Sequence, residues 1–232
     1  MSGKANPPPL RNTLREGLAM PALLANPFRA PRKGKQIGEG RAVLVIPGLA
    51  TGDISTLLMR RTLRARGFVP SGWRLGMNHG ADLAKLARLE ARVAALHSQT
   101  GRKVVVIGWS LGGLYARILG QRASEHIASV ITVGSPFSGG RRDNAGWRYY
   151  ELINDHSVDN PPFAEDFSQK PPMPTVAIWS AIDGIVAAHS ARGRDDESDL
   201  RIEVKAQHFA LGTSRRCIEQ VIDAIAMADT LG

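Results

Sequence analysis

The chain has 232 residues, of which 43% are hydrophobic, and this is enough for one globular domain around a single apolar core. No apolar run reaches the length of a membrane span, and the single cysteine excludes an internal disulfide. The formal net charge of +9 leaves contact with an anionic surface open.

Residues 1–40 are expected to form a basic, proline-rich arm ahead of a domain over residues 41–232. Residues 1–41 contain eight Lys or Arg and two acidic residues, and we expect this segment to wrap the surface or to be partly disordered. The apolar side chains that could pin it to the domain are Leu18, Met20, Leu23, Leu24 and Phe28. The arm has no apolar leader, so we expect a cytoplasmic protein, and its charge suggests peripheral contact with an anionic membrane surface.

The first strand is predicted over residues 41–46, and a turn-rich loop over residues 47–52 follows it. A loop of this form after an early strand can supply a backbone N–H group that binds an oxyanion. We assign this donor to Leu49, with Ala50 in reserve, because Gly48 would let the backbone approach a substrate closely. An ordinary strand-to-helix loop with turn residues is the alternative.

The most informative segment is Gly108-Trp109-Ser110-Leu111-Gly112. A helix predicted over residues 82–99 and a buried strand over residues 103–107 precede it, and a helical pattern begins at Leu111. This order is that of a nucleophile elbow, in which glycines are needed because the strand and helix backbones leave no room for a Cβ atom. Ser110 is therefore the predicted nucleophile, with the Leu111 N–H group as the first oxyanion donor. A glycine-rich turn with an incidental serine is the alternative.

A long connection follows the strand predicted over residues 128–133. Residues 137–173 contain Trp147, Tyr149, Tyr150, Leu152 and Phe163, so this segment is a candidate lid or cap over an apolar acyl chain. A helical excursion that only covers the core is equally compatible with the pattern. Together with residues near the predicted nucleophile and acid, the connection supplies the candidate substrate-pocket residues, which are Trp109, Ala50, Trp147, Tyr150 and Ile185.

An acid and a base are predicted after two later strands. Asp183 follows the strand over residues 175–179, and His208 lies on the loop after a strand predicted over residues 200–206. A neutral imidazole can take a serine proton only if its other nitrogen is held by an acceptor, and this is the role we assign to Asp183. Alone, an Asp before a Gly is also a common turn residue, and a loop histidine is usually a surface residue.

Other acids and histidines fit this pattern less well. The rival acids are in a dense charged run that is typical of a solvated loop: Asp195, Asp196, Glu197 and Asp199. The remaining histidines precede Ser110, lie near the end of its helix or follow no strand: His79, His97, His126, His156 and His189. No metal-ligand spacing, phosphate loop or nucleic-acid-reading motif occurs, so we expect no metal, no cofactor and no nucleic-acid partner.

The last predicted helix covers residues 214–227, with Cys217 as a packed thiol in its apolar face. With this helix, the predicted strands alternate with helices along the chain. Such an alternation indicates a parallel sheet with helices on both faces.

Taken together, residues 41–230 resemble the α/β-hydrolase superfamily, in particular small lipases and esterases. The elbow at 108–112, the acid loop at 180–186 and the histidine loop at 207–212 occur in the family's order, and the segment 130–136 is similar to the strand after the elbow helix in lipase-like members. The resemblance implies a mostly parallel central sheet with helices on both faces and a minimal lid. It also implies hydrolysis of carboxylic esters but does not supply the substrate, which we expect to be a small-molecule or lipid ester that is cleaved through an acyl-enzyme. The chain departs from many members at Pro47-Gly48, where they carry His-Gly.

Two other classes of function stay open. An acyltransferase or thioesterase would use the same three side chains with a different acceptor or leaving group. A non-catalytic binding protein could also have this fold, because architecture alone does not determine function.

Overall fold

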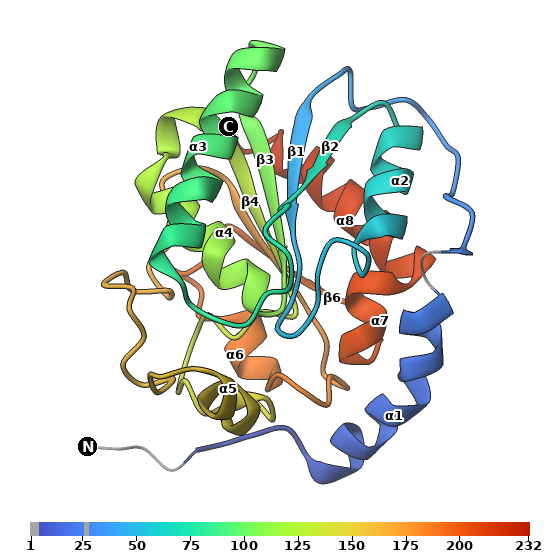
Figure 1. Ribbon diagram of the computed structural model, residues 1–232. Helices are drawn as coiled ribbons and strands as arrows, with labels where there is room; N and C mark the ends of the chain where they lie inside the picture. Colours follow the sequence, from blue (N-terminus) through green and yellow to red (C-terminus); the bar gives the residue numbers. More distant parts are fainter. Residues whose placement is uncertain (1–4, 26–27) are drawn as a thin grey trace.

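A six-stranded, fully parallel sheet forms the centre of the computed structural model, which describes residues 5–25 and 28–232 (Figure 1). The strand order is β2-β1-β3-β4-β5-β6, and every neighbouring pair is parallel. The strands are β1 (Ala42–Ile46), β2 (Val69–Gly72), β3 (Val104–Trp109), β4 (Ile127–Val133), β5 (Thr175–Trp179) and β6 (Leu200–Glu203). The predicted parallel architecture is therefore confirmed, and the carboxyl ends of all six strands lie at one edge.

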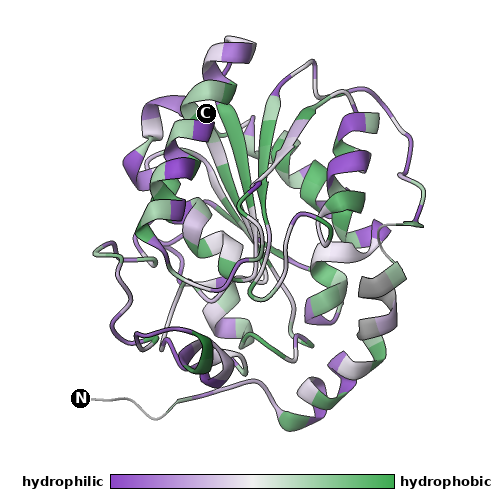
Figure 2. Cartoon of the chain, viewed as in Figure 1, coloured by the Kyte–Doolittle hydropathy of each residue, from purple (hydrophilic) through white to green (hydrophobic). Residues whose placement is uncertain are grey.

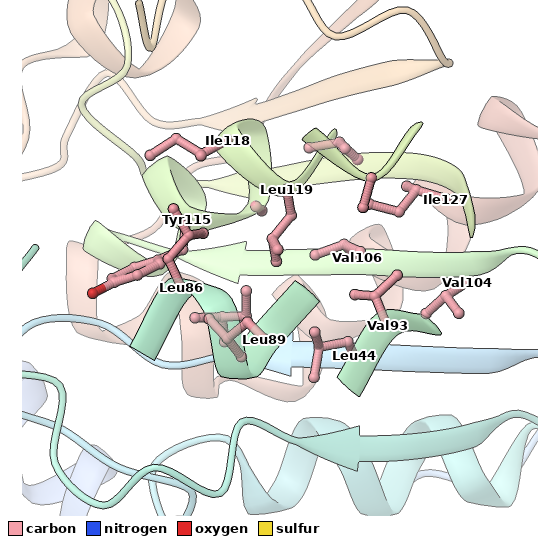
Figure 3. Packing of buried hydrophobic residues seen from close by; sticks show 14 of the residues in the cluster. Leu44, Leu86, Leu89, Val93, Val104, Val106, Tyr115, Ile118, Leu119 and Ile127 are labelled. Atoms are coloured by element: carbon pink, nitrogen blue, oxygen red, sulfur yellow. The ribbon is translucent and has the colours of Figure 1, made fainter. Parts of the chain in front are cut away.

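Helices cover both faces of the sheet (Figure 1). On one face, α3 (Leu83–Thr100) and α4 (Leu111–Arg122) pack on alternate strand residues such as Leu44 and Val106 (Figure 3). On the other face, α2 (Leu57–Ala65) and α8 (Arg215–Ala228) pack on the intervening residues, such as Val45. Figure 2 shows the resulting pattern, with hydrophobic central strands and helices that are hydrophilic on their outer sides. Two hydrophobic clusters thus sandwich the sheet, as expected when both faces of a parallel sheet are covered.

Side-chain caps and glycine set the ends of the two helices that the sequence predicts best. The carboxylate of Asp82 accepts a hydrogen bond from the Lys85 N–H group at the start of α3, and Gly101 ends that helix with a φ of 64°. The Ser214 hydroxyl accepts from the Cys217 N–H group at the start of α8. Leu83, in the first turn of α3, is 49% exposed, so the apolar face of this helix begins at Leu86.

Three parts of the secondary structure differ from the sequence prediction. Neither β2 nor α2 was expected from the pattern. The strand β2 is short, contains Pro70 and pairs only with β1, and proline is tolerated on such an edge strand because no second neighbour needs its N–H group. The last strand ends at Glu203 rather than at residue 206, and His208 begins the short helix α7 (His208–Thr213) instead of lying on a loop.

The N-terminal arm contains a helix, α1 (Leu10–Ala25), which lies beside α7 (Figure 1). The expected apolar attachment is wrong for Leu18 and Phe28, which are 78% and 88% exposed. The side chains of Met20, Leu23 and Leu24 lie outside the described residues. Polar groups fasten α1 instead, including the Thr13 hydroxyl, which donates to the carbonyl of Gly184. No helix in the described ranges is both long and apolar enough to cross a bilayer.

The connection between β4 and β5 is mostly irregular, with one helix, α5 (Trp147–Ile153), and a second short helix, α6 (Ala188–Arg192), follows β5. Arg117, which is fully buried in α4, attaches this connection to the core. Its guanidinium stacks on the ring of Phe137 at 4.2 Å and donates to backbone carbonyls of Phe167, Ser168, Gln169 and Glu197. Burial lowers the pKa of Arg117 to about 10, so the group stays charged at neutral pH and holds these carbonyls firmly.

Candidate active site

Ser110 lies on a strained turn between β3 and α4, with φ of 54° and ψ of −125°. The turn brings two backbone segments into contact. A Cβ atom on Gly108 would lie 2.2 Å from the carbonyl oxygen of Gly112, and one on Gly112 would lie 2.4 Å from that of Ile46. Glycine is required at both positions. The hydroxyl is held at the N-terminus of α4, where free N–H groups and the helix dipole favour negative charge.

His208 joins the predicted nucleophile to the predicted acid. Its Nε2 atom is 2.9 Å from Ser110 Oγ, and its Nδ1 atom is 2.8 Å from Asp183 Oδ2. The other carboxylate oxygen of Asp183 accepts from the N–H groups of Ile185 and Val186, each at 2.8 Å. Asp183 and His208 are only 2% and 3% exposed, so the carboxylate is held in one orientation with one oxygen free for the imidazole.

The environment of His208 favours its protonated form. Burial opposes the charge, but the negative charge of Asp183 and its hydrogen bond outweigh that effect, and Glu16 adds to them. The pKa of His208 therefore lies above its ordinary value of 6.5. This environment strengthens the imidazole as a base, since an imidazolium formed by proton transfer is stabilised by the neighbouring carboxylate.

Two backbone N–H groups beside Ser110 have no recorded hydrogen-bond partner among the described residues. They belong to Leu111, at the start of α4, and to Leu49, in the loop after β1. The reserve donor, Ala50, is occupied, because its N–H group donates to the carbonyl of Asn78 at 2.7 Å. Gly48 lies close to the serine, where an added Cβ atom would be 3.1 Å from Ser110 Cβ. Binding of an oxyanion requires two free donors, so both N–H groups are candidates for that role.

Asn78 supports this loop, and the sequence analysis missed it. Its side-chain amide donates to the carbonyl of Pro47 at 2.8 Å, and its N–H group donates to the carbonyl of Thr51 at 2.8 Å. The side chain is fully buried. Its carbonyl also accepts from the Ala50 N–H group, so Asn78 holds both ends of the 47–51 loop. This loop begins with Pro47-Gly48, where many α/β-hydrolases carry His-Gly. The residue lies in an irregular segment with no motif, so no local signal identifies it.

Ser110 lines two cavities at the carboxyl end of the sheet. One of them, the apolar cavity, has a mostly apolar lining that includes Leu49, Leu114, Tyr115, Trp147, Tyr150, Phe163, Phe167 and Ile185. The second cavity is lined by Gly48, Leu49, Ala50, Thr51, Trp109, Tyr149, Ile185, His208 and Phe209. Of the candidate pocket residues, Trp147 and Tyr150 line the apolar cavity, Trp109 and Ala50 line the second cavity, and Ile185 lines both.

The rival acids are engaged elsewhere. Asp195 pairs with Arg201, and Asp199 pairs with Lys170 and accepts from the Thr175 N–H group. The expectation of a solvated loop is wrong for Glu197, which is 2% exposed and accepts from the Arg194 N–H group at 2.7 Å. A buried acid in a charged run is unusual, and here the backbone donor compensates its loss of water.

Two further His–Asp pairs occur in the structure, His156 with Asp155 and His189 with Asp143. The hydrogen bonds recorded for these imidazoles lead to Asp155, Tyr150 and Asp143 rather than to the nucleophile. In residues 5–25 and 28–232, no three His, Cys, Asp or Glu side chains gather as metal ligands would.

The sequence matches no protein-family model and no curated protein. Solved structures are similar to it at low identity. A structure of the metagenome-derived lipolytic enzymes LipS and LipT is 13% identical, covers 87% of this chain and 100% of its own, and gives a TM-score of 0.62. A serine hydrolase involved in carbazole degradation is 15% identical over 82% of this chain and 92% of its own, with a TM-score of 0.59.

A monoacylglycerol lipase from Paleococcus ferrophilus is also similar, at 13% identity over 84% of this chain and 96% of its own, with a TM-score of 0.54. The shared feature of these likenesses is the α/β-hydrolase fold, and the chain has that fold.

Proposed function

We propose that the chain is a serine hydrolase that cleaves carboxylic esters through an acyl-enzyme. One observation carries the proposal. His208 is hydrogen-bonded to both Ser110 and Asp183, beside an apolar cavity and two free backbone N–H groups. The esterase and lipase names of several structural neighbours agree with this reaction.

Each residue has one role in the proposed reaction. Ser110 Oγ attacks the ester carbonyl while His208 Nε2 takes the hydroxyl proton, and the N–H groups of Leu49 and Leu111 bind the oxyanion that forms. The tetrahedral intermediate then collapses, and the leaving alcohol receives the proton from His208. Water then attacks the acyl-enzyme while His208 takes a proton from the water. The second tetrahedral intermediate collapses, so that a carboxylic acid is released and His208 returns the proton to Ser110.

A fluorophosphonate probe tests the proposal directly, because only an activated serine reacts with it. We expect stoichiometric labelling of Ser110, located by peptide mass spectrometry, and hydrolysis of p-nitrophenyl esters by the same preparation. Labelling at another serine, or none on a folded chain, would exclude the proposed nucleophile and leave a non-catalytic binding protein as the better description.

The linings of the two cavities favour an apolar acyl group in the apolar cavity and the alcohol in the second cavity. The acyl group fits the apolar cavity because its lining is mostly hydrophobic and aromatic. A series of esters of increasing acyl length measures the depth of this cavity. The acyltransferase and thioesterase alternatives are tested by adding a competing alcohol and by a panel of thioesters.

We further infer that the arm can hold the protein against an anionic lipid surface. Leu10, Leu14 and Leu18 are 72%, 72% and 78% exposed and recur every four residues on α1, so they form one apolar stripe, with the exposed Arg11 and Arg15 nearby on the helix. An apolar stripe beside cationic side chains is the pattern of interfacial helices.

Replacing all three leucines of the stripe with serine is expected to lower binding to phosphatidylserine-containing vesicles about 100-fold, since roughly 1 kcal/mol is lost per leucine that is only partly inserted. Hydrolysis of a soluble ester should not change. Leu152→Ser, at an 80% exposed position on α5, is the matched control. Equal sedimentation of the triple variant and the unmodified chain with these vesicles would contradict the inference.

A further inference from the structure

A buried carboxylate from the arm reaches the loops that carry the predicted acid and base. This carboxylate belongs to Glu16, which lies on α1 and is only 3% exposed. Its Oε1 atom accepts from the N–H group of Gly184 at 2.9 Å and from that of His208 at 2.7 Å. Its Oε2 atom accepts from the N–H group of Phe209 at 3.3 Å. One side chain therefore binds the residue after Asp183 and the backbone of His208 itself.

The two loops that Glu16 joins follow different strands. Asp183 comes after β5 and His208 after β6, so the distance between the two side chains depends on the conformations of two separate loops. Hydrogen bonds of 2.8 and 2.9 Å on the two sides of one imidazole tolerate little relative movement of these loops. A single carboxylate that accepts from both loops fixes their relative position.

Further contacts of α1 reinforce the acid loop. The Thr13 hydroxyl donates to the carbonyl of Gly184 at 2.7 Å. The backbone packs just as closely, because a Cβ atom on Gly184 would lie 2.3 Å from the carbonyl oxygen of Asn12. Gly184 is therefore held by Glu16 at its N–H group and by Thr13 at its carbonyl group, so the peptide groups on both sides of this residue are restrained.

The charge of Glu16 also acts on His208. The groups that face the imidazole are the hydroxyl of Ser110, the neutral rings of Trp109 and Phe209, and the carboxylates of Asp183 and Glu16. Of these, the two carboxylates carry charge and both favour the imidazolium. Glu16 thus supports the proton transfer in two ways, by geometry and by charge.

We propose that Glu16 is a positioning residue for the ester hydrolysis proposed above: from the N-terminal arm, it holds the acid loop and His208 in the arrangement that activates Ser110. The proposal rests on that function. The competing explanation is that Glu16 only attaches α1 to the domain. It would then affect the melting temperature but not the titration of His208.

Three variants separate these explanations. Glu16→Ala should lower kcat for a soluble p-nitrophenyl ester about 10- to 100-fold, the range expected when a reacting group is misplaced by about 1 Å, and should leave KM unchanged because the cavities keep their lining. Glu16→Gln keeps an acceptor of the same length without the charge. It should recover much of kcat, with the rise of activity moved to lower pH because the pKa of His208 falls. Gly17→Ala, at an exposed position on the same helix where an added Cβ atom would meet no other atom within 4 Å, should match the unmodified chain.

NMR titration of the His208 ring provides a readout that does not depend on turnover. A folded Glu16→Gln variant with an unchanged His208 titration would overturn the positioning role, even if Glu16→Ala fails to fold. Unchanged kcat and pH dependence in Glu16→Ala would overturn it as well. If the unmodified chain hydrolyses no ester while the His208 titration moves as expected in Glu16→Gln, the hydrolase function fails and the contact between Glu16 and His208 stands.

Discussion

Ser110→Ala is expected to lower the turnover of a short-chain p-nitrophenyl ester by roughly 10⁴- to 10⁶-fold, as loss of such a nucleophile does in serine hydrolases. The substitution removes the atom that would form the acyl-enzyme, so labelling by a fluorophosphonate should disappear as well. Alanine meets the same strained φ of 54° that serine meets, so the turn and the cavities should persist.

The measurement for Ser110→Ala compares initial rates with the unmodified chain, after circular dichroism has established that both are folded. A small residual rate above that of the uncatalysed reaction agrees with the proposed mechanism, because substrate binding and the oxyanion donors remain in the variant. Undiminished turnover in a folded variant would remove Ser110 from the reaction.

Asp183→Asn is expected to lower kcat by about 10⁴-fold while the variant stays folded. The cause lies in the two N–H groups, from Ile185 and Val186, that bind one carboxylate oxygen. In the variant, these donors hold the amide oxygen, so the amide NH₂ group points at His208 Nδ1. The imidazole must then accept there and carry its proton on Nε2, which leaves it unable to take the proton of Ser110.

The same substitution should also change the pH dependence of the remaining activity. Asp183 is the leading cause that raises the pKa of His208, so its removal lowers that pKa. The base is active when neutral, and a lower pKa makes it neutral at lower pH. The rise of kcat/KM should therefore move to lower pH. Asp199→Asn is the control, and a severe loss of activity in that variant instead would mean that Asp183 is not the acid.

Local signals were sufficient to predict the elbow and the strands that precede Ser110 and Asp183, but not the helix α7, which begins at His208. The elbow glycines at 108 and 112 and the caps Asp82 and Ser214 each act within a few residues of the chain, so their patterns are visible in the sequence. The parallel sheet follows from the same kind of signal, because the strands alternate with periodic helices.

Long-range polar contacts could not be predicted in this way. Glu16 meets His208 across 192 positions, and Asn78 meets Pro47 across 31, and neither lies in a motif. The attachment of the arm also differs from the prediction, since we expected apolar side chains such as Leu18 to attach it. Buried hydrogen bonds from Thr13 and Glu16 do this instead, and the sequence alone does not tell a buried carboxylate from a solvated one.

The anchoring of the irregular connection by Arg117 has a consequence for redesign of the substrate range. Phe163 and Phe167 line the apolar cavity, and the carbonyl of Phe167 is among those that the guanidinium holds. The backbone at Phe167 is thus fixed to α4, the helix that begins next to Ser110. We therefore expect smaller side chains at Phe163 and Phe167 to allow bulkier acyl groups to bind, whereas outward movement of the segment is prevented. Variants that change the size of these side chains should hydrolyse bulky esters faster than variants that change the length of the connection.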